Sequence, residues 1–352
     1  MFKELLQKTK KHYNNSLPFV LYRKPGVPEV KGIFQQDDRI YYTETFSESG
    51  FVFAPFDIHK KSILLKPDEV SSCNFSVPEQ TSAQPVFPDP RQADKTRHYK
   101  LVAKGIHAIK NGPLRKVVLS RKISQKVTKT PFEVFQSLLS FYPTAFCYLW
   151  YHPKIGLWSG ATPETLIVAK NGKFKTMALA ATRRVTEGRF PDWGQKEKLE
   201  QAMVTEYIAN ALAEKADGIQ TSEVRNAKAG NLWHLQTLIT GDFSGSSLKT
   251  IIDALHPTPA VCGLPLQEAL NFIQEYEQYD REYYTGFLGE LHLEDHGEAH
   301  LFVNLRCLQI QQGEAIIYVG GGITEDSLPE QEWQETIDKS TTIARALYNS
   351  AE

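Results

Sequence analysis

Four glutamates stand in two pairs, and the members of each pair are three residues apart. Glu197 and Glu200 form the first pair, and Glu332 and Glu335 form the second. Each pair lies in a segment with helical periodicity, where residues three apart share a face, so each helix can direct two carboxylates at one point. Hard oxygen ligands suit Mg²⁺, which keeps several waters and takes one or two protein carboxylates. Solvated acidic helix faces show the same spacing, so the pairs alone leave both interpretations open.

Three further charged residues stand among apolar neighbours. Lys116 opens a β-branched run, Arg306 lies within residues 301–308, and Glu164 follows the segment 160–163. An ionisable group in such a run either faces solvent from a strand or has a functional role with altered protonation. Taken singly, each run favours the solvent-facing position.

A run of three glycines, Gly320 to Gly322, follows a predicted strand and precedes a predicted helix. Glycines let the backbone approach a ligand closely and offer amides to an anion, but the run is equally typical of a tight turn. Dinucleotide and phosphate-binding loops are excluded, because their glycine spacing and Lys-Ser/Thr pair are missing. Ser327 and Glu330 fit a capping box for the next helix, and Pro329 fits its first turn.

Helices and strands must position these groups, and the sequence predicts both. Hydrophobic periodicity indicates long helices over about residues 193–216, 265–278 and 329–349. Strands grouped in hairpins, with helices between the groups, favour an α+β fold with large antiparallel sheets over repeated βαβ units. The expected strands cover residues 116–123 and 144–151, the hairpin 165–169 and 173–179 joined at Asn171-Gly172, and the antiparallel meander 286–293, 299–310 and 315–319.

The composition is that of an ordinary globular protein, with 41% hydrophobic and 23% charged residues. The formal net charge of −1, from 40 basic and 41 acidic residues, argues against a nucleic-acid partner but not against a local basic pocket. The cysteines at positions 73, 147, 262 and 307 form no close pair, which indicates reduced and mostly buried thiols.

The N-terminal segment lacks the apolar core of a signal peptide and predicts an ordinary first helix. No apolar run is long enough to cross a bilayer, so we expect a cytoplasmic protein with no membrane partner. Residues 1–95 form a variable front section that we expect to contribute to the same fold as the rest. A proline-rich stretch over residues 84–90 is typical of a connection.

From about residue 98 to the C-terminus the chain resembles the chorismate-utilising enzymes, which include isochorismate, salicylate, anthranilate and aminodeoxychorismate synthases. So many motifs follow the order of that family that the resemblance is far more specific than any single motif. The matching stretches are Lys116-Val-Val-Leu-Ser-Arg121, Gly160-Ala-Thr-Pro-Glu164, Leu179-Ala-Ala-Thr-Arg183, Lys196-Glu-Lys-Leu-Glu200, Trp233-His234-Leu235, Leu255-His-Pro-Thr-Pro-Ala-Val-Cys-Gly263, Asp280-Arg281, Tyr284-Thr-Gly286, Leu305-Arg306, Gly320-Gly-Gly-Ile323, and Glu332-Trp-Gln-Glu-Thr336 with Lys339.

The resemblance implies two large, mainly antiparallel sheets packed as a sandwich, with helices outside and the active site in the cleft between the sheets. It also implies that residues 96–352 form a catalytic domain that binds chorismate, and that the protein is a monomer. Glu200 and Glu335 resemble the Mg²⁺ ligands of the family, with Glu197 and Glu332 in support. The metal is expected to hold the ring carboxylate of chorismate.

The remaining site residues implied by the resemblance bind the substrate. Arg306 and Tyr284, with the amides near Gly320 and Gly322, resemble the grip on the enolpyruvyl carboxylate. The other expected contacts are His234, Thr258 and Thr182, which line the cleft, and Lys339, one helical turn beyond Glu335.

Family members that add water carry a lysine base at the position of Lys116, whereas those that use ammonia generally lack it. The resemblance therefore implies Mg²⁺-dependent conversion of chorismate to isochorismate, by attack of water at C2 with loss of the C4 hydroxyl. Lys116 accepts a proton only when it is neutral, and Glu164 donates one only when it is protonated, so both require altered ionisation.

Three alternatives belong beside this interpretation. Salicylate synthase forms isochorismate and then eliminates pyruvate with the same residues, so the sequence leaves it open. Lys116 argues against anthranilate or aminodeoxychorismate synthase, and the intact acidic and basic residues argue against a non-catalytic chorismate-binding protein. The sequence does not distinguish a menaquinone pathway from a siderophore pathway.

The chain departs from the family pattern at three positions. Ala181 stands where the family usually has glycine, which crowds the ring carboxylate or shifts a backbone amide. Gln201 replaces a frequent histidine beside Glu200, and Asn304 replaces a small residue near Arg306. None of these changes removes a catalytic group.

Overall fold

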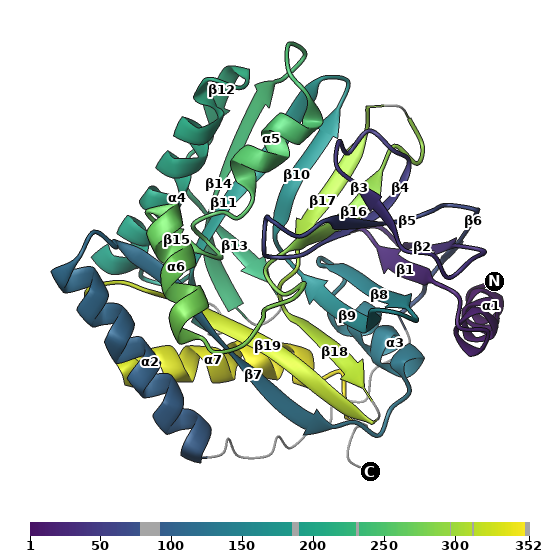
Figure 1. Ribbon diagram of the computed structural model, residues 1–352, viewed down its shortest axis with the longest axis horizontal. Helices are drawn as coiled ribbons and strands as arrows, with labels where there is room; N and C mark the ends of the chain where they lie inside the picture. Colours follow the sequence, from purple (N-terminus) through teal and green to yellow (C-terminus); the bar gives the residue numbers. More distant parts are fainter. Residues whose placement is uncertain (78–91, 185–189, 230–231, 296, 312, 349–352) are drawn as a thin grey trace.

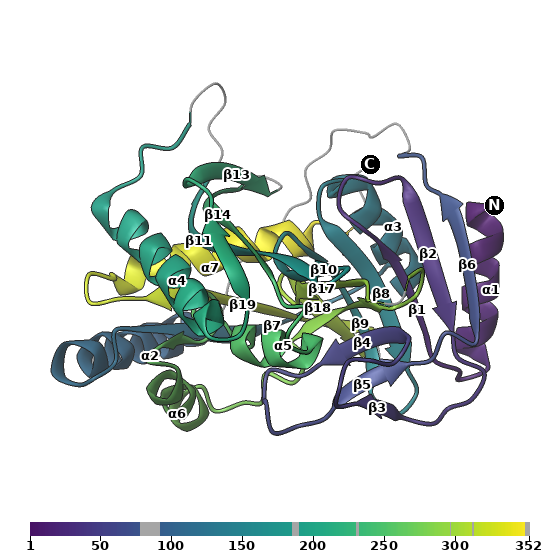
Figure 2. The same cartoon turned by 90° about the horizontal axis from the view of Figure 1, so that it is seen from above.

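Two large antiparallel β-sheets pack face to face in the computed structural model, and helices lie on their outer faces (Figures 1 and 2). The structure describes residues 1–77, 92–184, 190–229, 232–295, 297–311 and 313–348. The strand pairs that position the site, from β7 and β19 to β11 and β14, are all antiparallel. The predicted α+β class with a two-sheet sandwich is therefore confirmed.

The strands of the front section are divided between the two sheets. Within the described residues, sheet A has the order β15 (Gly263–Leu264), β7 (Lys116–Lys126), β19 (Glu314–Ile323), β18 (Cys307–Gln311), β9 (Gly156–Thr162), β8 (Phe146–His152), β1 (Phe19–Arg23), β2 (Glu29–Phe34) and β6 (Glu69–Asn74). Sheet B has the order β12 (Asp217–Thr221), β14 (Leu232–Asp242), β11 (Lys173–Arg184), β10 (Thr165–Lys170), β17 (Ala299–Val303), β16 (Phe287–Leu291), β4 (Gly50–Ala54), β5 (Ser62–Leu65) and β3 (Tyr41–Thr43), and β13 (Arg225–Ala229) pairs with β14. The first 74 residues thus supply strands to both sheets.

Apolar clusters explain how the layers are held together. Between the sheets the core is rich in aromatic residues, including Tyr148, Trp150, Trp158 and Phe302, all buried, and each large ring removes much apolar surface from water. The described helices are α1 (Phe2–Asn14), α3 (Pro131–Phe141) and the end of α7 (Pro329–Ala344) over sheet A, α4 (Gln195–Ala213) and α5 (Leu248–Leu255) over sheet B, and α2 (Gln92–Asn111) and α6 (Leu266–Tyr276) beside β7.

The hairpin predicted at Asn171-Gly172 joins β10 to β11. Both turn residues have positive φ, 52° for Asn171 and 76° for Gly172, as a two-residue type I′ turn requires. The helices expected at 193–216, 265–278 and 329–349 correspond to α4, α6 and α7. All four cysteines are free and buried, as predicted.

The strand expected over residues 299–310 is wrong, because two strands in different sheets replace it. β17 ends at Val303 in sheet B, and β18 begins at Cys307 in sheet A. Asn304 anchors the crossover, since its amide donates to the Tyr283 carbonyl and its side-chain oxygen accepts from the Tyr148 hydroxyl, at 2.8 and 2.7 Å. Arg306 follows with φ of +47°, a left-handed conformation that ends regular strand geometry.

A second crossover lies beside the first. Pro163 and Glu164 connect β9 in sheet A to β10 in sheet B, and these strands pair with β18 and β17. The Glu164 carbonyl accepts from the Val303 amide at 3.0 Å, and the Arg306 carbonyl accepts from the Ala161 amide at 3.1 Å. The two charged residues that seemed to interrupt strands therefore stand on adjacent links between the sheets.

The predicted capping box before α7 is also wrong. Leu328 occupies the N-cap position, and the Ser327 hydroxyl instead accepts from the Thr324 amide at 3.0 Å. Pro329 begins the helix as expected. The proline-rich stretch 84–90 lies outside the described residues. No helix in the described part of the chain is long and apolar enough to cross a membrane.

Candidate active site

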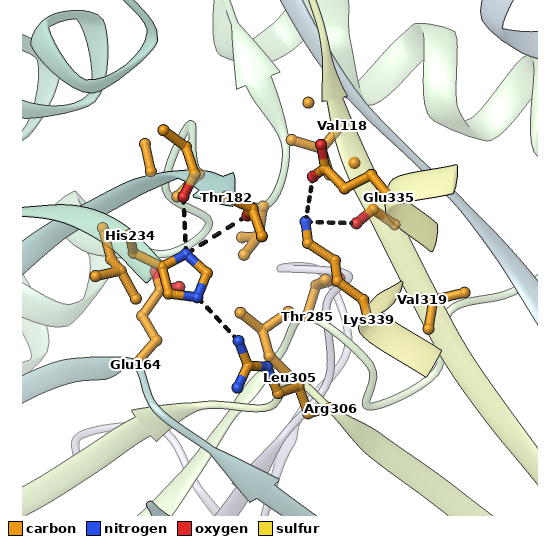
Figure 3. A pocket seen from close by; sticks show the side chains of 18 of the residues that line it. Val118, Glu164, Thr182, His234, Thr285, Leu305, Arg306, Val319, Glu335 and Lys339 are labelled. Carbon is orange, nitrogen blue, oxygen red and sulfur yellow. Dashed lines mark hydrogen bonds and ion pairs between the residues drawn. The ribbon is translucent and has the colours of Figure 1, made fainter. Parts of the chain in front are cut away.

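A cavity opens between the two sheets and the helices α4 and α7. Figure 3 shows Glu335 and Lys339 on one side of it and Glu164 and His234 on the other. The predicted site residues that line this cavity are Lys116, Glu164, Thr182, Glu200, His234, Tyr284, Arg306, Gly320, Gly322, Glu335 and Lys339. They come from segments spread over more than 200 positions of the sequence, which the sandwich brings together.

Three predicted residues do not line the cavity. Glu197 and Glu332 instead form ion pairs with Arg183 and Lys196. Thr258 is buried in the turn whose backbone accepts from the Val261 and Cys262 amides, so it shapes the segment that presents Val261 to the cavity. Sequence reasoning omitted several lining residues, which include apolar Val118, Leu179, Ala260 and Leu305 and the hydroxyl-bearing Thr285 and Tyr318.

Lys116 is the first residue of β7, and its side chain is 1% exposed. Its ammonium lies 2.9 Å from Oε1 of Glu200 on α4. Gly322 on the neighbouring strand makes room for this pair, because a Cβ there would lie 2.9 Å from Cε of Lys116 and 2.6 Å from Oε1 of Glu200. The glycine run is thus an open backbone surface against which the side chains of Lys116 and Glu200 pack. This excludes the interpretation of the run as only a tight turn.

The Glu164 side chain is buried at the crossover between β9 and β10. Burial raises the pKa of its carboxyl to about 7, although the nearby cations of Lys116, Lys339 and Arg306 oppose the rise. Desolvation wins because the carboxylate loses its hydration in the closed site. A carboxyl group with this pKa is partly protonated near neutral pH and can act as a proton donor.

Each carboxylate of the two helical pairs has a basic partner. Glu335 pairs with Lys339 at 2.7 Å, and Glu332 pairs with Lys196 of α4 at 2.9 Å. Glu197 pairs with Arg183 of β11 at 2.9 Å. With the contact between Lys116 and Glu200, these ion pairs join α4, α7, β7 and β11 around one end of the cavity.

The donor set fits a magnesium ion. Oε2 of Glu332 is buried and has no hydrogen-bond partner among the described residues, and burial beside Glu335 raises the pKa of the Glu332 carboxyl. A Cβ at Gly321 would lie 3.3 Å from Oε2 of Glu332 and 3.6 Å from Oε1 of Glu335. At the next glycine, Gly322, the nearest carboxylate is that of Glu200 on α4, so carboxylates from two helices face one glycine-lined surface. In the described ranges no three His, Cys, Asp or Glu side chains are grouped so that they could hold a metal ion by themselves.

Arg306 and Tyr284 line the same cavity, where Tyr284 is buried and Arg306 is half-buried. Tyr284 stacks on Tyr318 with ring centroids 5.4 Å apart, and its hydroxyl lies 3.0 Å from the position of a Cβ at Gly320. Lys339 donates to the Gly320 carbonyl at 3.0 Å. A guanidinium, a phenol and an ammonium beside open glycine backbone form a site for carboxylate groups.

An ion pair completes the edge of sheet A beside this cavity. β15 covers only the first two residues of β7, and beyond them Glu277 accepts from the Ser120 amide at 2.7 Å while Arg281 donates to the Val118 carbonyl at 2.7 Å. The Glu277 and Arg281 side chains also pair with each other and are fully buried. The Glu277 and Arg281 side chains therefore replace the hydrogen bonds of a neighbouring strand, because they satisfy the backbone groups of β7 next to Lys116.

The departures from the family pattern have structural explanations. Ala181 has φ of +60°, a left-handed conformation that favours glycine. Gln201 is buried behind the cavity, where its amide donates to the Ala178 carbonyl at 3.1 Å and to the Thr237 hydroxyl at 3.2 Å. Asn304 anchors the crossover that presents Arg306.

The sequence matches the family described as "Chorismate binding enzyme" over residues 57–348, and the chain belongs to that family of enzymes. It is 29% identical over 324 residues to the isochorismate synthase DhbC of Bacillus subtilis, covering 83% of this chain and 79% of that protein. It is 31% identical over 323 residues to MenF of Mycobacterium tuberculosis, covering 83% and 84%. The crystal structure of DhbC from Bacillus anthracis has the same fold, with a TM-score of 0.81 at 24% identity over 97% of this chain and 99% of that chain.

Proposed function

We propose that this enzyme is a magnesium-dependent isochorismate synthase, which adds water at C2 of chorismate and releases the hydroxyl at C4. The observation that carries the proposal is the presence of Lys116 and Glu164 in one buried cavity of a chorismate-binding enzyme. The likeness to the isochorismate synthase of Bacillus subtilis supports the same assignment. Lys116 argues against ammonia as the nucleophile, as the sequence comparison within the family implies.

The two residues have opposite tasks in this proposal. Lys116 takes a proton from the attacking water as the new C2–O bond forms, a step that requires the neutral amine and not the ammonium that pairs with Glu200. Protonated Glu164 gives a proton to the C4 oxygen as that bond breaks, so the hydroxyl leaves as water and the ring double bond shifts. One water enters and one leaves, which makes the net reaction an isomerisation. Each positioned proton transfer typically contributes roughly 10²–10⁴-fold to the rate.

The cations of the cavity bind the substrate, which carries two carboxylates. Arg306 and Tyr284 hold the enolpyruvyl carboxylate, and Lys339 adds positive charge at the Gly320 backbone. Glu200 and Glu335 hold Mg²⁺, supported by Glu197 and Glu332. The bound ion supplies positive charge for the ring carboxylate.

Product analysis tests the proposal. Purified protein is incubated with chorismate and MgCl₂, with and without ammonium, and the products are separated by chromatography. Accumulation of isochorismate supports the proposal. Salicylate with an equal amount of pyruvate identifies a salicylate synthase, and an ammonia-dependent aminated product identifies the anthranilate type. No turnover under any condition identifies a non-catalytic chorismate-binding protein.

We further propose that the enzyme acts as a monomer in the cytoplasm. Four buried free thiols suit a reducing compartment, where no disulfide forms. All the residues that line the cavity belong to one chain, so the proposed site needs no residue from a second copy. Light scattering of the purified protein tests the oligomeric state.

A further inference from the structure

A β-bulge in sheet B faces a single histidine. In the pairing of β11 with β14, Ala180 lies opposite Leu235 and Arg183 lies opposite Trp233. Ala181 and Thr182 together therefore stand opposite one residue, His234. Ala181 is in the left-handed region with φ of +60°, as the first residue of a glycine-type bulge is. A bulge redirects the backbone groups and side chains around it, so its contacts reveal what it positions.

The bulge fixes the proton on the imidazole of His234. The Nδ1 atom lies 2.8 Å from the carbonyl oxygen of Ala181, and a carbonyl only accepts, so Nδ1 carries the hydrogen. The Nε2 atom lies 2.9 Å from Nη2 of Arg306, and a guanidinium only donates, so Nε2 accepts. These two contacts select the same neutral tautomer, and Figure 3 shows them on the two sides of the ring. A third and longer contact joins Nδ1 to the Thr182 hydroxyl at 3.5 Å, and this hydroxyl can accept from the same Nδ1 hydrogen.

The electrostatic surroundings agree with a neutral ring. Burial lowers the pKa of His234 to about 3, and the cations of Arg306 and Lys339 add to the effect. A histidine in this state cannot donate from Nε2 to a substrate. It offers a lone pair there, and Arg306 already lies at hydrogen-bond distance from that lone pair.

A neutral acceptor has a specific advantage beside this arginine. A fully buried arginine nearby, Arg281, is held instead by the carboxylate of Glu277, which cancels its charge. The imidazole of His234 holds the Arg306 guanidinium in one orientation without adding a negative charge. The imidazole itself therefore does not weaken the attraction of Arg306 for an incoming carboxylate, and the loss of side-chain freedom on binding is reduced.

We infer that His234 is a positioning residue that orients the Arg306 guanidinium toward the substrate carboxylate, and that the Ala181–Thr182 bulge holds His234 in the tautomer this requires. The identity of the bound carboxylate rests on the proposed function. The orientation of Arg306 by a neutral imidazole does not, because it follows from the two contacts of the ring.

Two variants separate the two contacts of the ring. His234→Asn places a donor near the position of Nδ1 and can still bond to Ala181, but it cannot reach Arg306. His234→Gln places an acceptor near the position of Nε2 and can still hold Arg306. Chorismate affinity is measured by calorimetry, alongside kcat, KM and Tm. We expect His234→Gln to stay within about threefold of the wild-type dissociation constant, and His234→Asn to weaken it about tenfold or more.

A matched control is His256, a half-buried histidine that bonds to the Pro55 carbonyl and does not line the cavity. His256→Asn is expected to change Tm without changing chorismate affinity. Equal affinity losses in His234→Asn and His234→Gln, or wild-type affinity in both, would overturn the inference. A fall in kcat with unchanged affinity in both variants would also overturn it and would place His234 in the chemistry.

A spectroscopic measurement distinguishes failure of this inference from failure of the proposed function. Long-range nitrogen–proton spectra of protein with labelled histidine report the tautomer of each ring, and the signal missing in His234→Gln identifies His234. A neutral ring protonated at Nδ1 is expected at pH 7 without substrate. A ring protonated at Nε2, or at both nitrogens, would overturn the inference even in an active isochorismate synthase. The expected tautomer in a protein without that activity would reject only the proposed function.

Discussion

The ammonium of Lys116 lies 2.9 Å from Oε1 of Glu200, so the proposed base and a proposed metal ligand form one contact. Both side chains rest on Gly322, where a Cβ would collide with the pair. The residue proposed to activate water and a residue proposed to bind the metal are therefore in direct contact. A change at either one alters the surroundings of the other, which decides how the variants below must be measured.

Removal of magnesium should abolish turnover. We expect a chelator to stop isochorismate formation and added MgCl₂ to restore it, because Glu200 and Glu335 are proposed to hold the ion. Glu335→Gln should be inactive and should lose the rise in Tm that MgCl₂ gives the wild type. Glu330→Gln is the matched control, since Glu330 is an exposed residue of the same helix and should keep both responses. Full activity after exhaustive metal removal would refute the metal assignment.

Loss of either proton-transfer group should lower kcat far more than chorismate affinity. Lys116→Ala removes the base and Glu164→Gln removes the acid, and each acts on a group whose charge changes only in the transition state. We expect losses of roughly 10²–10⁴-fold in kcat. Because both act in one step, the double variant should be little worse than either single variant.

The measurement for these variants must include Tm, since Lys116→Ala also leaves Glu200 without its partner in a largely buried place. Lys116→Met keeps most of the side-chain volume and separates the loss of the amine from the cavity. A folded Lys116→Ala protein with near-wild-type kcat would contradict the water-activation mechanism.

Glu164 should make the fold less stable at high pH. The pKa of its carboxyl is about 7 in the folded protein and about 4.5 when unfolded, so the folded state binds the proton more tightly. Its contribution is complete below pH of about 4.5 and is lost as the pH rises through about 7. Glu164→Gln cannot ionise and should escape this loss, which is about 3 kcal/mol from a shift of this size. Urea unfolding at pH 5 and pH 8 checks this, and an equal pH dependence in both proteins would contradict it.

Arg306→Ala should raise KM for chorismate by roughly 10–100-fold, because a guanidinium that holds a carboxylate acts in the ground state and the transition state alike. Arg306→Lys keeps the charge but loses the two-pronged geometry, so an intermediate KM is expected. Steady-state kinetics with a check of Tm measures both. A fall in kcat alone would place Arg306 in the chemistry or the scaffold.

Ala181 should tolerate glycine and reject valine. Glycine relieves a left-handed conformation that costs an alanine roughly 1–2 kcal/mol, but it also removes a buried methyl worth about 0.8 kcal/mol. We therefore expect Ala181→Gly to change the free energy of unfolding by at most about 1 kcal/mol. A β-branched residue cannot adopt this φ cheaply, so Ala181→Val should lose about 2 kcal/mol or more. Thermal unfolding of both variants decides, and similar Tm values would show that the bulge relaxes.

The sequence predicts the parts of the fold that depend on local pattern. The Asn171-Gly172 hairpin and the helix that carries Glu332 and Glu335 need only neighbouring residues to define them. The break between Val303 and Cys307 escapes prediction, because both flanks are apolar and β-branched or aliphatic, and the side-chain bonds of Asn304 to distant residues end the strand. Pattern alone cannot register a contact with a residue more than 100 positions away.

The sequence also predicts some features of the candidate site and misses others. Spacing and resemblance identify the four glutamates, but they do not identify their partners, because Lys116, Arg183 and Lys196 approach from other elements. Nor does the sequence reveal that Arg306 is held by a neutral histidine. That relation depends on a one-residue offset between β11 and β14, which only the paired strands define.

The side-by-side links at Pro163–Glu164 and Asn304–Arg306 also limit how this enzyme can change in length. Each link is bounded by strands whose side chains alternate between a packed and an opposite face. One residue added to or removed from a link would turn every side chain of the following strand to the wrong face. The loss would fall on the aromatic core between the sheets, well beyond the cavity. Insertions and deletions should therefore be tolerated at turns such as Asn171-Gly172. At these two links they should prevent folding, whatever chemistry the cavity performs.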